Sequence, residues 1–123
     1  SMDTYLARYI LELSLQEYRF VKYSASHLAA AAIYASRLTL RQKHLWTATL
    51  RHYTRLDLSD LTECTAEMLE VHRSAAANQL QAVYEKFSHS PYMHVATAVT
   101  PMAESDPRVQ ALHAARSGDS GSL

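Results

Sequence analysis

Histidines are the first residues to consider for chemistry, because the imidazole ring is the commonest metal ligand in proteins. The sequence contains seven of them. His44 and His52 are eight residues apart and His89 and His94 are five apart, so neither pair has the i, i+4 spacing of helix-borne zinc sites. No second cysteine is available to complete a mixed site. We therefore expect no metal and no cofactor, with scattered and mostly exposed histidines.

The single cysteine and a row of carboxylates are the other candidate reactive groups. Cys64 falls on an apolar stripe with Leu61, Met68 and Val71, which predicts a buried, inert thiol. A parallel acidic stripe lies about 100° away on the same helix. Its members are Asp60, Glu63, Glu67 and Glu70. A solvated helix face is the expected role of this acidic stripe, and binding of a basic partner or a cation is the alternative. We expect no catalytic residues and no enzymatic activity.

Composition favours an intracellular, all-α domain. The chain has 123 residues, enough for one core, and its two glycines, Gly118 and Gly121, leave the first 117 residues without any. Lys plus Arg equals Asp plus Glu at 12 each, which argues against a nucleic-acid partner. A polybasic anchor and a long apolar run are absent from the sequence, so no membrane partner is expected. A single cysteine permits no internal disulfide.

Hydrophobic periodicity predicts five helices that must position these groups. They are expected over 4–18, 25–38, 44–53, from Asp57 onward, and 76–87. The second carries no charged residue between His27 and Arg37 and contains four consecutive alanines, so other helices should surround it. The predicted core residues are Leu6, Ile10, Leu13, Leu28, Ala31, Ala32, Ala35, Leu50, Leu61, Met68, Leu80, Val83 and Phe87.

After Phe87 the character of the sequence changes. Pro91 and Pro101 indicate an extended segment over 88–102, and Asp106-Pro107 predicts the start of a short helix over 107–116. Residues 117–123 are expected to form a flexible end. We divide the chain into a helical domain over 3–96 and an extended tail over 97–123. Ser1 and Met2 are left out of the domain because they are typical of a remnant of tag removal.

Four residues are candidates for a partner surface: Trp46, Tyr92, Val109 and Leu112. Aromatic side chains favour interfaces, although most of the tyrosines are expected in the core. We also expect self-association of the chain, or exchange of the segment from Tyr92 to Leu112 between copies, because uncovered apolar surface tends to pair.

Four segments, in order, resemble the second cyclin fold of mitotic (A- and B-type) cyclins. They are Leu6-Ala7-Arg8-Tyr9-Ile10-Leu11-Glu12-Leu13-Ser14, the alanine-rich stretch Tyr23 to Ala32, Trp46 with Leu50 and Tyr53, and Lys86-Phe87-Ser88-His89-Ser90-Pro91-Tyr92. Pro91 stands where the family usually has lysine, and the likeness ends near residue 96.

The resemblance implies a single five-helix cyclin-box fold around the buried, alanine-rich second helix, plus a C-terminal extension. It also implies a regulatory subunit of a cyclin-dependent protein kinase in cell-cycle control, located in the nucleus, the cytoplasm or both. The motifs by which the family's first fold grips the kinase are absent from this sequence, so we expect a scaffold domain without activity of its own. A TFIIB-like transcription-factor repeat or another interaction adaptor is the alternative, because fold likeness alone does not choose a function.

Overall fold

The computed structural model describes residues 1–116, and these are all-helical, as predicted. The helices are α1 (Met2–Ser14), α2 (Ala25–Thr39), α3 (Ala48–Thr54), α4 (Leu58–Ser74), α5 (Ala82–Lys86), α6 (Val95–Ala98) and α7 (Pro107–Arg116). Three short 3-10 turns are η1 (Tyr18–Phe20), η2 (Ala75–Ala77) and η3 (Ser90–Tyr92). The expectation of a flexible end at 117–123 lies outside the described residues. Within the described part, no helix is both long and apolar enough to cross a membrane.

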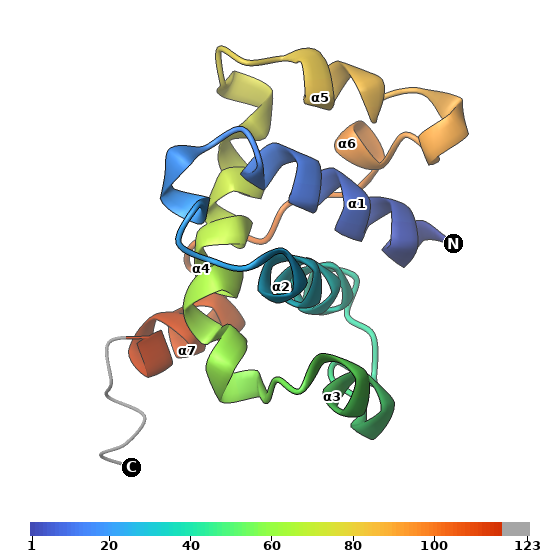
Figure 1. The fold of residues 1–123 in the computed structure, drawn as a ribbon. Helices are drawn as coiled ribbons and strands as arrows, with labels where there is room; N and C mark the ends of the chain where they lie inside the picture. The colour runs from blue at the N-terminus through green and yellow to red at the C-terminus, as the bar shows by residue number, and fades with distance from the viewer. Residues whose placement is uncertain (117–123) are drawn as a thin grey trace.

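The alanine-rich α2 lies at the centre of the bundle. It packs against α1, α4 and α3, while α1 also contacts α4, α5 and α6 (Figure 1). Ala31 and Ala35 are completely buried, and Ala30 and Ala32 are almost so. Since an alanine side chain ends at Cβ, the neighbouring helix axes can approach α2 closely. The prediction that other helices pack around this buried, alanine-rich helix is therefore confirmed.

Side-chain caps set several helix boundaries. The Ser24 hydroxyl accepts a hydrogen bond from the His27 N–H at 3.2 Å at the start of α2. The Thr47 hydroxyl does the same for the Leu50 N–H, so α3 begins at Ala48 and not at the predicted His44. Asp57 and Asp60 form a capping box at the start of α4.

Two predicted helices are too long. The first ends at Ser14 because Glu17 adopts extended backbone, and its carboxylate pairs with Arg19 at 2.9 Å. The fifth is broken between η2 and α5. Asn78 is extended there and its side chain accepts a hydrogen bond from the Leu80 N–H at 2.8 Å, in competition with helical pairing.

Most of the predicted core is buried. The buried members are Leu6, Ile10, Leu13, Leu28, Ala31, Ala32, Ala35, Leu61, Met68 and Phe87. Leu50 and Val83 are half-buried. The prediction for Leu80 is wrong: this side chain is 54% exposed, because the break at Asn78 turns it away from the bundle.

The segment after residue 96 packs onto the same bundle. Val95, Val99 and Met102 are buried, and α7 packs along α4 (Figure 1). The helix over 107–116 is found as predicted, whereas the extended stretch predicted over 88–102 also contains η3 and α6. The extended residue His89 precedes η3, and Met93 and His94, both in the left-handed region, separate η3 from α6. A domain boundary at residue 96 stays a prediction.

Candidate interaction surfaces

The acidic stripe of α4 is bound by the connection between α1 and α2. Lys22 Nζ lies 3.0 Å from a Glu63 oxygen and 3.4 Å from a Glu67 oxygen. The Tyr23 hydroxyl lies 3.0 Å from a Glu63 oxygen and 2.5 Å from a Glu67 oxygen, so its single O–H is shared between the two carboxylates. Burial, followed by these hydrogen bonds, raises the pKa of Tyr23. Glu67 is only 4% exposed, so the expectation of a solvated face is wrong for that residue.

Two side chains with reactive atoms are buried in α4. Cys64 is fully buried, and burial raises the pKa of its thiol to about 12, which fits the predicted inert thiol. His72 is 2% exposed, and its ring meets Tyr9 edge-on at 5.8 Å between centroids. Burial, with a contribution from Arg73, lowers the pKa of His72 to about 4, so the imidazole is neutral at pH 7. The expectation of an exposed histidine is wrong here.

The four predicted partner residues do not form one surface. Val109 and Leu112 are buried where α7 packs on α4, at 0% and 8% exposure, so they offer no free surface. Trp46 is half-buried, and its indole N–H donates a hydrogen bond to the Leu56 carbonyl at 2.9 Å. Tyr92 is half-buried too, and its ring packs against Tyr5 and Phe87.

Tyr92 belongs to a small aromatic and cationic group. Its ring centroid lies 4.6 Å from that of Phe87 and 6.0 Å from that of Tyr5. The Arg8 guanidinium carbon is 5.3 Å from the Tyr92 ring centroid, and Lys86 Nζ is 5.5 Å from it. These contacts account for the buried part of the ring. A role of its exposed part in binding stays a prediction.

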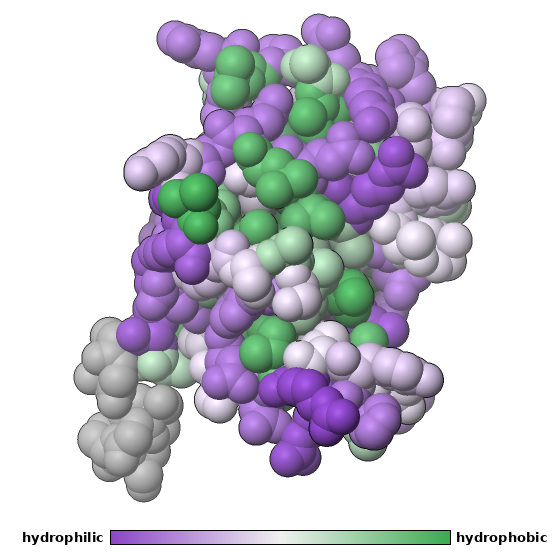
Figure 2. Space-filling view, viewed as in Figure 1, coloured by the Kyte–Doolittle hydropathy of each residue, from purple (hydrophilic) through white to green (hydrophobic). Residues whose placement is uncertain are grey.

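An apolar surface that the sequence pattern did not reveal lies on the α1–α2 connection. Leu15 is 63% exposed, Tyr18 86% and Val21 70%. With Phe20 and Leu28 they line a hollow of about 420 Å³. Figure 2 shows hydrophobic side chains at the surface over this side of the molecule. All three exposed residues come after Leu13, the last buried apolar residue of α1. Apolar residues that continue beyond the buried stripe of a helix were the feature of the sequence that could have predicted this surface.

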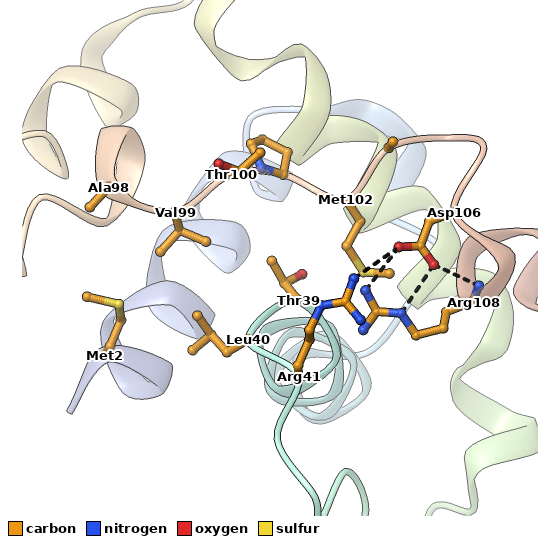
Figure 3. A pocket seen from close by; sticks show the side chains of 12 residues that line it. Met2, Thr39, Leu40, Arg41, Ala98, Val99, Thr100, Met102, Asp106 and Arg108 are labelled. Carbon is orange, nitrogen blue, oxygen red and sulfur yellow. Dashed lines mark hydrogen bonds and ion pairs between the residues drawn. The ribbon is translucent and has the colours of Figure 1, made fainter.

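A larger pocket of about 570 Å³ lies between the end of α2 and the segment that joins α6 to α7 (Figure 3). Met2, Leu40, Val99 and Met102 supply apolar walls. At the polar end Asp106 accepts hydrogen bonds from Arg108, with Nη2 at 3.0 Å from Oδ2, and Arg41 approaches the same oxygen at 3.9 Å.

The charges of this pocket are used within the domain. The hydrogen bonds from Arg108 hold the pKa of Asp106 below its usual range. Arg108 also donates to the Leu38 carbonyl at 2.6 Å, at the end of α2. The group therefore joins α7 to α2, and the pocket is best explained as part of the packing of the C-terminal segment.

Residues 1–116 thus form an all-helical domain. Their buried ionisable groups make internal contacts or are held neutral, and no three His, Cys, Asp or Glu side chains in this range are grouped as metal ligands. The exposed features are surfaces, one apolar and several charged, and not a cleft with convergent reactive groups.

Comparison with known proteins identifies the family. Residues 2–101 match the family model of the cyclin C-terminal domain. The chain is 38% identical over 98 residues to Cyclin-A2-1 of Arabidopsis thaliana, covering 79% of this chain and 22% of that protein. It is 39% identical over 92 residues to G2/mitotic-specific cyclin-B of Dictyostelium discoideum, covering 74% and 21%. The chain belongs to the cyclin family and corresponds to its C-terminal domain.

A further relative is Putative cyclin-B3-1 of Arabidopsis thaliana, 37% identical over 91 residues and covering 74% of this chain and 23% of that protein. Both A- and B-type names are found among these relatives, so the predicted mitotic-cyclin resemblance and the cyclin fold are confirmed. The chain spans about a fifth of the length of the curated relatives it matches.

Proposed function

We propose that this chain serves as the C-terminal cyclin domain of a regulatory subunit that binds and activates a cyclin-dependent protein kinase. The observation that carries the proposal is the match over residues 2–101 together with A- and B-type relatives. Activation by such a subunit is a shift of the kinase between conformations, driven by binding, with the phosphoryl-transfer chemistry supplied by the kinase. The subunit itself is not an enzyme in this proposal.

The role assigned to this domain is structural support. A core in which α2 packs against α1, α3 and α4 gives a rigid block, since close-packed interiors transmit force with little deformation. The stage of action that we propose is G2 and mitosis, following the name of one relative, the G2/mitotic-specific cyclin-B. We place the protein inside the cell, in the nucleus or the cytoplasm, with no nucleic-acid or membrane partner required for this role.

A chimaera tests the proposal directly. This domain would replace the C-terminal cyclin domain of an A- or B-type relative, and phosphorylation by that relative's kinase would be measured. We expect the chimaera to stimulate the kinase, and the 123-residue chain alone to give no stimulation. The relative's N-terminal part without any C-terminal domain is the control. A folded chimaera that performs no better than this control would contradict the proposal, and strong stimulation by the chain alone would contradict the support role.

Self-association of the chain stays a prediction. Because Val109 and Leu112 are buried within one copy, an exchange that uses them would require α7 to leave α4. Light scattering of the purified chain over a range of concentrations measures this. A mass equal to one chain at every concentration would contradict self-association.

A further inference from the structure

The zero net charge of this chain conceals a strongly uneven distribution. Between Glu17 and Asp57 the sequence contains no Asp or Glu. The same stretch contains seven Lys and Arg residues: Arg19, Lys22, Arg37, Arg41, Lys43, Arg51 and Arg55. The absence of a basic face was expected because the net charge of the chain is zero. A zero net charge does not make each face of the molecule neutral.

The structure separates these cations into two groups. Arg19 and Lys22 are paired with carboxylates of α4, Arg19 with Glu70 at 3.2 Å. The other five lie in the final part of α2, in the loop that follows it, and in and just after α3. Among these five, Arg41 approaches Asp106 at 3.9 Å and Arg51 pairs with Asp57 at 2.6 Å. Strongly hydrophilic residues gather at the end of the molecule where α3 lies (Figure 2). We call the surface formed by Arg37, Arg41, Lys43, Arg51 and Arg55 the basic end.

Within the basic end, a hollow of about 430 Å³ is lined by Ala48, Arg51, His52, Arg55 and Asp57. Two arginines and one aspartate line the hollow, so these side chains give it a net positive charge even with a neutral imidazole. Arg51 Nε lies 2.6 Å from Asp57 Oδ1. That ion pair uses the Nε–H and leaves the donors on both Nη atoms of Arg51 directed elsewhere.

Arg55 is the second cation of the hollow, and the end of α3 fixes its backbone. It caps α3 in the left-handed conformation, with φ of 62°, and its N–H donates to the Arg51 carbonyl at 2.8 Å. The two arginines are therefore four residues apart across a single helical turn and its cap. Arg51 is 68% exposed, so its charge is available to a ligand.

We propose that this hollow binds the phosphate of a phosphorylated serine or threonine in a partner peptide. Guanidinium groups suit a phosphate because each offers paired N–H donors that match two of its oxygens. A phosphoryl group carries a charge of about −1.5 to −2 at pH 7, which exceeds that of the Asp57 carboxylate with which it competes. The exposed Tyr53 ring, 5.5 Å from the His52 ring between centroids, offers a surface for a residue beside the phosphate.

A peptide fits these observations better than a nucleic acid. Asp57, Asp60 and Glu63 are exposed on the first turns of α4, immediately after the basic end. A long polyanion laid across α3 would meet all three carboxylates, whereas a single phosphate in the hollow would meet only Asp57 among them. Nucleic-acid binding also requires a track of cations that follows successive phosphates, not one convergent pair.

Fluorescence anisotropy with the whole chain tests the proposal. The probe is a short, otherwise neutral peptide carrying one phosphothreonine, compared with its unphosphorylated form, a glutamate form and a single-stranded DNA oligonucleotide. We expect the phosphopeptide to bind tighter than the other three probes. Equal binding of the phosphorylated and unphosphorylated peptides, or tighter binding of the DNA, would overturn the proposal.

Three variants locate the binding. Arg55→Gln should weaken phosphopeptide binding by about tenfold, as loss of one charge-assisted contact implies. Lys43→Gln is the matched control, because it removes an exposed cation of the basic end that does not line the hollow. We expect it to change binding less than Arg55→Gln, and equal effects would show general charge attraction and overturn the assignment of the hollow.

Asp57→Asn gives a change in the opposite direction. Asparagine is as good a helix cap as aspartate, so α4 should keep its start. Removal of the competing carboxylate should tighten phosphopeptide binding several-fold. A gain in affinity is not produced by misfolding, so unchanged or weaker binding by a variant with an unaltered circular dichroism spectrum would count against the proposal.

Discussion

The fully buried Ala35 in α2 provides the sharpest test of how this fold is held together. Its exposure is 0%, and α2 is in contact with both α1 and α4. Replacement by leucine adds three carbon atoms at a position where neighbouring helices already touch. The helix itself should tolerate the change, because alanine and leucine have similar helix propensities. The effect of Ala35→Leu therefore reports on packing.

The expected cost is that of an overfilled core. Inserted methylene groups force side chains out of their rotamers and helices apart, at about 1–3 kcal/mol. A domain of this size has a free energy of unfolding of about 5–15 kcal/mol, so the loss is a substantial part of the total. With an unfolding entropy of about 2.1 cal/mol/K per residue, each kcal/mol lowers Tm by about 4 °C. We therefore expect Tm to fall by about 4–12 °C.

Urea unfolding followed by circular dichroism, together with a thermal melt, measures this change. The control is Ala25→Leu, which adds the same atoms at an exposed position in the first turn of the same helix. We expect the control to change the free energy of unfolding by less than about 0.5 kcal/mol. If Ala35→Leu were equally harmless, α2 would have free space around it, and the inference that it is the packed centre of the bundle would be wrong.

Two further predictions concern the polar groups of α4. Tyr23→Phe removes the hydroxyl that hydrogen-bonds Glu63 and the buried Glu67, and should cost about 1–2 kcal/mol in urea unfolding. Tyr18→Phe, in an 86% exposed side chain, should cost almost nothing, and equal effects would contradict a role for the hydrogen bonds. The buried His72 has a folded pKa of about 4, below its ordinary 6.5, so the unfolded chain binds the extra proton as pH falls. The neutral His72 should therefore contribute about 3 kcal/mol to the free energy of unfolding above pH 6.5, and this contribution should be lost between pH 6.5 and 4. His72→Leu should flatten the dependence of the free energy of unfolding on pH in this range. An unchanged dependence would refute the inference that the buried His72 is neutral.

Much of the fold followed from local sequence signals. The charge-free, alanine-rich run predicted the buried α2, and the Asp57 and Asp106-Pro107 signals predicted the starts of α4 and α7. The fifth helix was predicted wrongly because hydrophobic periodicity does not show where a side chain competes with the backbone for hydrogen bonds. Asn78 takes a side-chain hydrogen bond that breaks the fifth helix, and Leu80 is exposed as a result.

The interaction surfaces were much harder to predict. The buried Glu67 depends on Lys22 and Tyr23, more than 40 residues away in the sequence. The exposed Leu15, Tyr18 and Val21 form a patch only because the chain turns after α1. Val109 and Leu112 looked like an unpartnered apolar pair, since a ten-residue amphipathic helix does not reveal where it packs. Their burial against α4 could not be read from that helix alone.

The sequence by itself determined the all-helical class, the starts of α2, α4 and α7, the central helix and the family. Helix caps and hydrophobic period are set by near neighbours along the chain, so the sequence alone reveals them. It also determined that no acidic residue falls between Glu17 and Asp57. Only the tertiary structure decided which of those cations are neutralised. Arg19 and Lys22 meet the carboxylates of α4, whereas the two arginines of the hollow, Arg51 and Arg55, share a single acidic residue, Asp57, which pairs with Arg51. The physical reason is that charge interactions depend on distance in space, and packing of the helices sets that distance.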